Sequence, residues 1–131
     1  MDDQGITIFV CVSCRRPTEE GDAAADRPGP RLVEALEAGL AAQAPGGVAV
    51  TAVECLAVCK RPCTVALSAA GKWTYLIGDL DPETHAGEIV SAALAFAASG
   101  NGILPWRERP ASFRKGVIAR VPPPAFKGFP S

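Results

Sequence analysis

Five cysteines, and the spacing between them, limit what this chain of 131 residues can form more than any other feature. They follow the pattern Cys11-x2-Cys14, then 40 residues, then Cys55-x3-Cys59-x3-Cys63. Five cysteines cannot all pair as disulfides within one chain, and clustered cysteines in a reducing compartment are more often metal ligands or catalytic thiols. The single histidine, His85, excludes a three-histidine zinc site and a two-histidine Rieske cluster.

Composition narrows the class of protein. Apolar residues make up 48% and charged residues 21% of the chain, which is ordinary for a globular protein. The net charge is −1 and the isoelectric point is about 5.8, so no global charge favours nucleic acid or anionic lipid. No apolar run approaches the roughly 20 residues that span a bilayer, and the acidic first residues do not resemble a secretory signal. We expect a cytoplasmic protein with no nucleic-acid or membrane partner.

The hydrophobic pattern predicts an α/β fold. Residues Leu32, Leu36 and Leu40 form the apolar stripe of one helix, and Asp81 is the expected N-cap of another, which ends near Ser99. The predicted order is strand Ile6–Val10, helix Arg31–Gln43, strands Val48–Val53, Thr64–Ser68 and Trp73–Ile77, and then the second helix. A helical crossover makes the first two strands parallel, while the last two form an antiparallel hairpin. This is the order of a small thioredoxin-like domain, with a four-stranded mixed sheet and two main helices.

The last segment of the chain differs from the rest. Residues 103–131 carry a net charge of +5 and six prolines, whereas residues 1–102 carry −6. Prolines at this density exclude a long helix. We therefore predict a metal-binding domain at 1–102 and a basic, Pro-rich extension at 103–131. The extension is expected to lie as an extended strap with one short helical turn across the acidic surface, with Trp106 and Phe113 as apolar anchors.

The predicted topology brings cysteines together at one end of the sheet. Cys11 ends the first strand and Cys55 follows the second, so both cysteine loops leave neighbouring parallel strands at the same edge. Thiolates from Cys11, Cys14, Cys55 and Cys59 can then converge. Sulfur-only ligation selects zinc or iron–sulfur chemistry. A dithiol redox pair at Cys11 and Cys14 is a further reading, because C-x-x-C after a strand is also typical of thioredoxins.

Two features around these four cysteines stay open. Cys63 begins a predicted strand. It is either a residue of the apolar core or a residue packed around the metal ligands, or it is itself a ligand and replaces Cys14. Four cations flank the cysteines, namely Arg15, Arg16, Lys60 and Arg61. They are either solvated loop charges or groups that lower thiol pKa values and offset the negative charge of a thiolate-bound cluster.

The second cysteine segment resembles a known family. Glu54–Leu67, ECLAVCKRPCTVAL, followed by Gly71–Tyr75, GKWTY, is similar to the thioredoxin-like 2Fe–2S ferredoxins, which include a subunit of respiratory complex I. Their second cysteine pair has the form C-L-x-x-C with a proline shortly after it, as in Cys55, Leu56, Cys59 and Pro62. This resemblance implies a one-electron carrier rather than an enzyme. It also implies a 2Fe–2S cluster on Cys11, Cys14, Cys55 and Cys59, and a redox partner protein.

A second resemblance covers nearly the whole chain. Trp106–Pro110, WRERP, and Gly116–Pro122, GVIARVP, look like the C-terminal signature of a bacterial family of predicted metal-binding proteins, domain of unknown function 1636. Its members are often encoded near cobalamin or cobalt-handling genes. This implies the alternative of a zinc- or cobalt-binding metal-handling protein, with a metal-handling enzyme as partner. The sequence leaves the oligomeric state open, with a homodimer as one option.

Overall fold

The computed structural model describes residues 5–13, 28–43, 47–57 and 63–124. In chain order the elements are β1 Ile6–Cys11, α1 Gly29–Gln43, β2 Val48–Val53, β3 Val65–Ser68, β4 Thr74–Ile77, α2 Ala86–Ala98, the 3-10 helix η2 Trp106–Glu108, α3 Ser112–Lys115 and β5 Val117–Val121. Every predicted strand and helix is present, with small differences at the ends. The predicted α/β class is confirmed.

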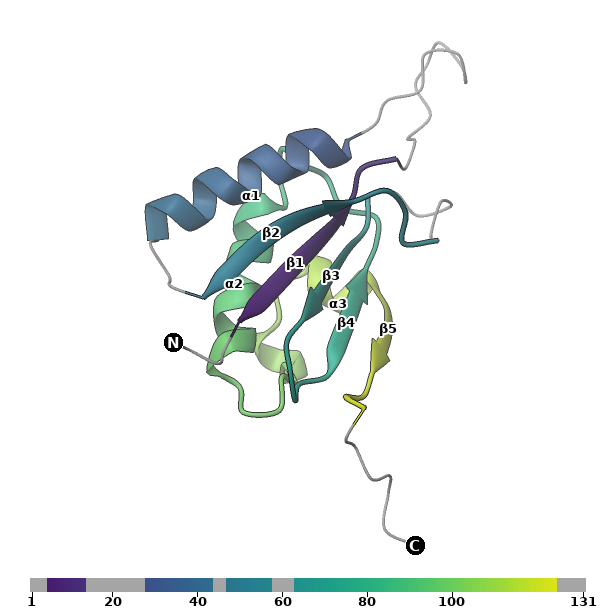
Figure 1. The fold of residues 1–131 in the computed structure, drawn as a ribbon. Coiled ribbons are helices and arrows are strands. Elements are labelled where there is room, and N and C mark those ends of the chain that lie inside the picture. The colour runs from purple at the N-terminus through teal and green to yellow at the C-terminus, as the bar shows by residue number, and fades with distance from the viewer. Residues whose placement is uncertain (1–4, 14–27, 44–46, 58–62, 125–131) are drawn as a thin grey trace, which may run out of the picture.

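The sheet is mixed and has five strands in the order β2-β1-β3-β4-β5. β1 and β2 are parallel, and the other three pairings are antiparallel. α1 packs against α2, and the two long helices cover one face of the sheet, as Figure 1 shows. The expected count of four strands is therefore wrong, because β5 adds an edge strand next to β4.

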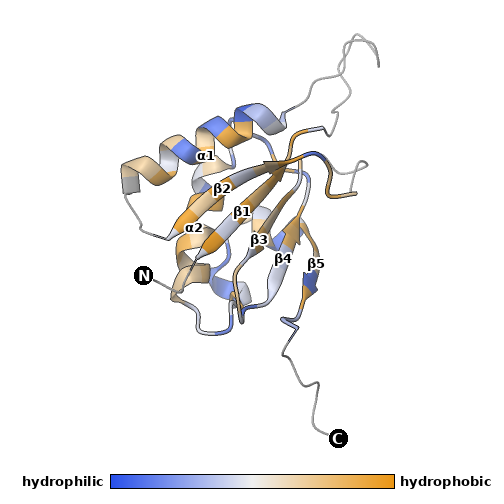
Figure 2. Ribbon diagram, viewed as in Figure 1, coloured by the Kyte–Doolittle hydropathy of each residue, from blue (hydrophilic) through white to orange (hydrophobic). Residues whose placement is uncertain are grey.

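One apolar core lies between the sheet and the helices. Alternate residues of β1, namely Ile6, Ile8 and Val10, are buried, as the two-residue period of a strand requires. They face the leucine stripe predicted for α1 and the buried side of α2. The helix residues of this core are Leu32, Leu36, Leu40, Ile89, Val90, Ala92, Ala93 and Phe96. Figure 2 shows the same apolar character along the central strands.

The C-terminal extension is more regular than the predicted strap. It forms η2, the short helix α3 and β5, and β5 pairs with β4 from Ile77↔Val117 to Thr74↔Val121. Its prolines up to Pro124 border these elements instead of interrupting them, which is why proline content did not exclude a strand. Phe113 is fully buried, as expected of an anchor, but Trp106 is 59% exposed, so that expectation is wrong. The division of the chain at residues 102 and 103 stays a prediction.

The start of α2 also differs from the prediction. Asp81 is not the N-cap of α2, because the helix begins only at Ala86. The Asp81 carboxylate accepts the Glu83 N–H at 2.8 Å, and the Asp81 carbonyl accepts the His85 N–H at 2.9 Å. These bonds form a separate turn ahead of the helix. His85 takes the N-cap position, and its Nδ1 accepts the Asp81 N–H at 2.9 Å.

Candidate metal centre

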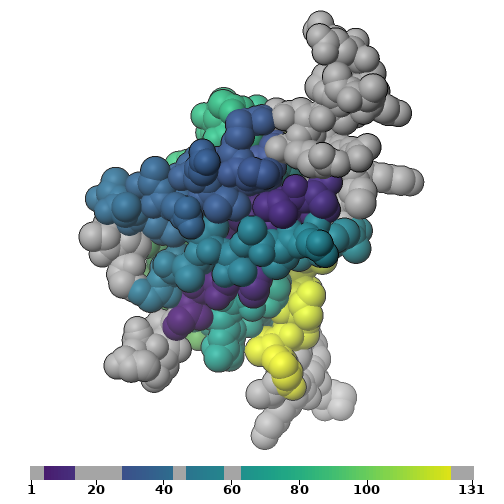
Figure 3. Space-filling view, turned by 45° about the horizontal axis from the view of Figure 1, so that its top comes forward, coloured from purple at the N-terminus to yellow at the C-terminus, as the bar shows by residue number. Residues whose placement is uncertain are grey.

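The ends of β1 and β2 bring two cysteine segments to the same edge of the sheet. In the parallel register Cys11 lies opposite Val53, and the Val12 N–H extends the pairing to the Val53 carbonyl at 2.9 Å. Cys55 follows Val53 by two residues. Figure 3 shows the end of the N-terminal strand beside β2, below α1. The predicted convergence of these two segments therefore rests on a parallel strand pair.

Cys11 is enclosed by backbone and short side chains. Its side chain is fully buried, with Sγ 3.8 Å from the Glu54 carbonyl oxygen and 4.0 Å from the Ser13 Oγ. The Ser13 hydroxyl donates to the same Glu54 carbonyl. This hydroxyl joins the turn after β1 to the turn after β2, so the two segments are held together by more than strand pairing.

Cys55 is exposed, and its sulfur accepts a backbone hydrogen bond. The Ala57 N–H donates to the Cys55 Sγ with a nitrogen–sulfur distance of 3.1 Å. Ala57 has a φ of 63°, in the left-handed region that non-glycine residues seldom adopt. This backbone conformation accompanies an amide directed at sulfur. Such amides stabilise negative charge on a thiolate and tune the potential of iron–sulfur sites.

Cys63 lies at the same edge but belongs to the apolar core. It is fully buried among the core residues, and its backbone pairs in both directions with Leu80, at 3.3 and 3.1 Å. The next residue, Thr64, accepts the Cys11 N–H at 3.0 Å. Cys63 is thus close to Cys11 along the sheet, while its side chain contributes to packing.

Cys14 and Cys59 lie outside the residues that the structure describes, as do the four cations Arg15, Arg16, Lys60 and Arg61. Within the described ranges, no group of three or more His, Cys, Asp or Glu side chains could hold a metal ion. The proposed ligand set, which needs both of these cysteines, therefore stays a prediction.

Sequence analysis missed Gly29, which supports the site from the start of α1. A Cβ at this position would lie 2.2 Å from the Cys11 carbonyl oxygen and 2.6 Å from the Val12 Cα. Only glycine allows the helix to approach the end of β1 this closely. The signal in the sequence is Gly29 between Pro28 and Pro30, directly ahead of the helix predicted from Arg31. The approach puts the positive end of the α1 dipole beside the Cys11 backbone.

Comparison with known proteins places the chain in a family. The model of the family described as protein of unknown function (DUF1636) matches residues 8–123. This chain belongs to the DUF1636 family. The resemblance predicted from its C-terminal motifs is thereby confirmed. No curated protein matches this DUF1636 chain.

A solved structure supports the fold assignment. The DUF1636 chain is similar to the thioredoxin-like [2Fe-2S] ferredoxin from Aquifex aeolicus, with 22% sequence identity and a TM-score of 0.57. The match covers 92% of this chain and 96% of the ferredoxin. The predicted thioredoxin-like fold is confirmed. In the described part of the DUF1636 chain, no helix is long and apolar enough to cross a membrane.

Proposed function

We propose that this protein is a ferredoxin-like iron–sulfur protein and carries single electrons, with a 2Fe–2S cluster held by Cys11, Cys14, Cys55 and Cys59. The observation that carries the proposal is the Cys55 sulfur, which accepts the Ala57 N–H at 3.1 Å. It lies two residues beyond the strand end that pairs with Cys11. The thioredoxin-like fold that the chain shares with a 2Fe–2S ferredoxin also supports it.

The described residues suit a thiolate-bound cluster in their donor chemistry. Soft thiolates select iron–sulfur clusters or zinc, and Cys11 and Cys55 supply one thiolate from each of the two loops. When bound, a 2Fe–2S cluster supplies reversible one-electron transfer. The chain's own contribution is to hold the ligands on two joined turns and to direct the Ala57 N–H at sulfur. The core position of Cys63 favours Cys14 as the fourth ligand.

In this proposal the protein makes and breaks no covalent bond in a substrate, so it is an electron carrier and not an enzyme. The exposure of Cys55 suits this role, because it leaves the edge of the sheet accessible to a redox partner. The buried Cys11 suits retention, since a shielded ligand exchanges slowly with solvent thiols and chelators.

Anaerobic purification followed by iron, sulfide, zinc and cobalt analysis tests the proposal. We expect red-brown protein with equal iron and sulfide, and loss of both in Cys55→Ser and in Cys59→Ser, because each variant removes a thiolate ligand. The control is Cys63→Ala, which removes a thiol from the core and should keep the iron. Colourless protein with one zinc would support the metal-handling alternative instead. Full iron content in either serine variant would show that the proposed ligand set is wrong.

A further inference from the structure

A basic surface with an exposed tryptophan lies on the C-terminal extension. We call it the extension surface and define it as Trp106, Arg107, Arg109 and Arg114. The first two residues belong to η2 and the last to α3. Arg114 joins the two elements, because its Nε donates to the Trp106 carbonyl at 3.2 Å and its terminal nitrogen donates to the Arg107 carbonyl at 3.0 Å.

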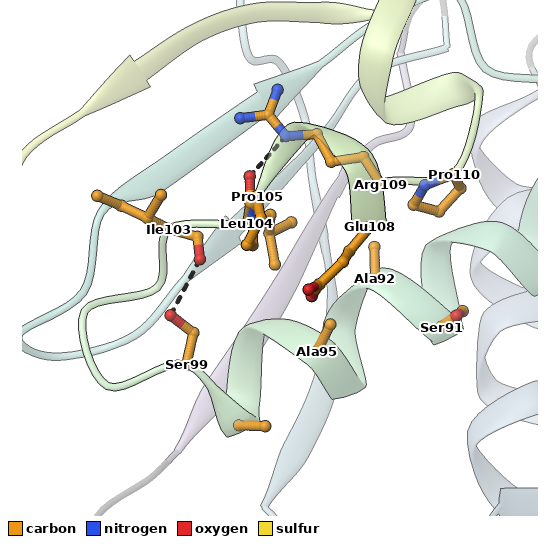
Figure 4. A pocket seen from close by; sticks show the side chains of 11 residues that line it. Ser91, Ala92, Ala95, Ser99, Ile103, Leu104, Pro105, Glu108, Arg109 and Pro110 are labelled. Atoms are coloured by element: carbon orange, nitrogen blue, oxygen red, sulfur yellow. Dashed lines mark hydrogen bonds between the residues drawn. The ribbon is translucent and has the colours of Figure 1, made fainter.

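The extension surface is held in place before any partner arrives. The Arg109 guanidinium lies between two rings, 5.5 Å from the Trp106 centroid and 5.4 Å from the Tyr75 centroid. Its Nε donates to the Leu104 carbonyl at 2.8 Å, which Figure 4 shows as a dashed line. Arg109 and Arg114 therefore lose little side-chain freedom when they bind something, and this lowers the cost of docking.

The positive charge of this surface is not neutralised by carboxylates. In the part of the chain that the structure describes, the guanidinium groups of Arg109 and Arg114 donate to carbonyl and hydroxyl oxygens, and no ion pair involves them or Arg107. By contrast, Arg31 on α1 pairs with Glu83 at 3.1 Å.

Trp106 gives the same surface an apolar anchor. It is 59% exposed, whereas Tyr75, Phe96 and Phe113 are fully buried. Tryptophan and arginine are the residues most enriched at the energetic centres of protein interfaces. The Trp106 ring contacts the Arg109 guanidinium, and Arg107 and Arg114 lie on the same two short helices. This combination is typical of a protein-binding surface more than of solvent-facing surface.

A cavity beside η2 adds room for an apolar group. It measures about 350 Å³ and lies between the second half of α2 and residues 103–110. Small residues of α2, including Ala92, Ala95 and Ala98, form one wall, while Ile103, Leu104 and Pro105 lie on the other. Figure 4 shows the Glu108 side chain on the cavity side of η2, while the Arg109 guanidinium points away from the cavity.

We infer that the extension surface docks an acidic surface of a partner protein, with Trp106 as the apolar anchor and the arginines as the charge contacts. A protein partner fits better than nucleic acid, because the whole chain carries a net charge of −1 and the arginines share their turn with Glu108. This docking role goes beyond electron transfer. The extension surface contains none of the cysteines. A result that contradicts docking can therefore be distinguished from a result that contradicts the iron–sulfur proposal.

The test uses a short fluorescein-labelled peptide of glutamates around a central leucine, with the wild-type chain at low salt. We expect saturable binding that weakens as salt rises. Arg107→Glu and Trp106→Ala should each weaken binding about tenfold or more. A few residues at the centre of an interface carry most of its binding energy, so loss of one of them lowers the affinity more than loss of a neighbouring residue does. The matched control is Arg31→Glu, which makes the same charge change at an arginine that already has a carboxylate partner. It should bind like wild type.

Iron content is measured on all four proteins and should not differ, and each should show one cooperative melting transition. These controls separate docking from folding and from the metal site. Equal binding by Arg107→Glu and wild type would overturn the inference. Tighter binding to a DNA duplex or to phosphatidylserine vesicles than to the peptide would also overturn it, in favour of another class of partner. Self-association of wild type that Arg107→Glu abolishes would identify a second copy of the chain as the occupant and would equally contradict it.

Discussion

At the scale of single residues, Lys72 shows how a buried charge can complete a helix. It is 8% exposed and lies in the hairpin between β3 and β4. Its Nζ donates to the carbonyl oxygens of Phe96, at 3.2 Å, Ala97, at 3.4 Å, and Ser99. The last carbonyls of a helix have no partners within the helix, and a cation is favourable at its negative end. Lys72 thus ties the hairpin to the C-terminal end of α2.

Lys72→Met should therefore destabilise the protein by about 2 kcal/mol, because hydrogen bonds that involve a charged group contribute roughly 1.5–3 kcal/mol. Chemical denaturation gives the free energy of unfolding. The control is Lys115→Met, an exposed lysine on α3, where we expect a change within about 0.5 kcal/mol. Equal stability of the two variants would mean that the Lys72 ammonium does not cap α2.

At the scale of elements, the extension is held to the rest of the fold by α3 and β5. The Glu88 carboxylate on α2 accepts the Ser112 hydroxyl at 2.7 Å and the Ser112 N–H at 3.0 Å. These bonds hold the pKa of Glu88 below its ordinary value of 4.5, so they stabilise the fold above that pH and are lost as the pH falls through the lower, folded-state pKa. Phe113, one residue further on, is buried in the core.

Phe113→Ala should lower the free energy of unfolding by about 3–5 kcal/mol, because it leaves a cavity in the core beneath α3. Trp106→Ala is the matched aromatic control and should cost less than about 1 kcal/mol, since the exposed ring contacts Arg109 by a cation–π interaction. Denaturant unfolding measures both values. Comparable losses in the two variants would contradict the assignment of Phe113, and not Trp106, as the anchor of the extension.

At the scale of the whole molecule, the candidate metal centre depends on segments far apart in the sequence. Pairing of β1 with β2 brings Cys11 near the Cys55 turn, and pairing of β1 with β3 brings Cys63 to the same edge. These three cysteines have different surroundings: Cys55 is exposed, Cys11 is buried beside a polar turn, and Cys63 is buried in the core. The fold thus separates cysteines that look equivalent in the sequence.

We predict that Cys14→Ala loses the metal and that Cys63→Ala keeps it, with a loss of stability of about 1 kcal/mol from the small cavity in the core. Metal analysis gives the first result, and thermal unfolding of the metal-loaded protein gives the second. The reverse pattern, with metal kept by Cys14→Ala and lost by Cys63→Ala, would make Cys63 the fourth ligand.

Much of the fold could be predicted from the sequence because local patterns determine it. The alternation of Ile6, Ile8 and Val10 and the stripe of Leu32, Leu36 and Leu40 each define one element and its buried face. The end of β1 at Cys11 and the position of Cys55 after β2 were likewise sufficient to expect two cysteine segments at one edge. The apolar patterns and the strand ends depend on residues that are close together in the sequence. They are therefore the same whichever part of the fold the element packs against.

Tertiary structure alone decided the rest. β5 is a strand because β4 offers it an unpaired edge. Trp106 is exposed because η2 buries none of its residues, whereas α3 directs Phe113 into the core. Lys72 caps a helix that begins fourteen residues later in the sequence, and Gly29 is required by the backbone of Cys11. Each of these outcomes depends on a partner that is distant along the chain. Local patterns of charge or hydrophobicity do not predict where that partner lies.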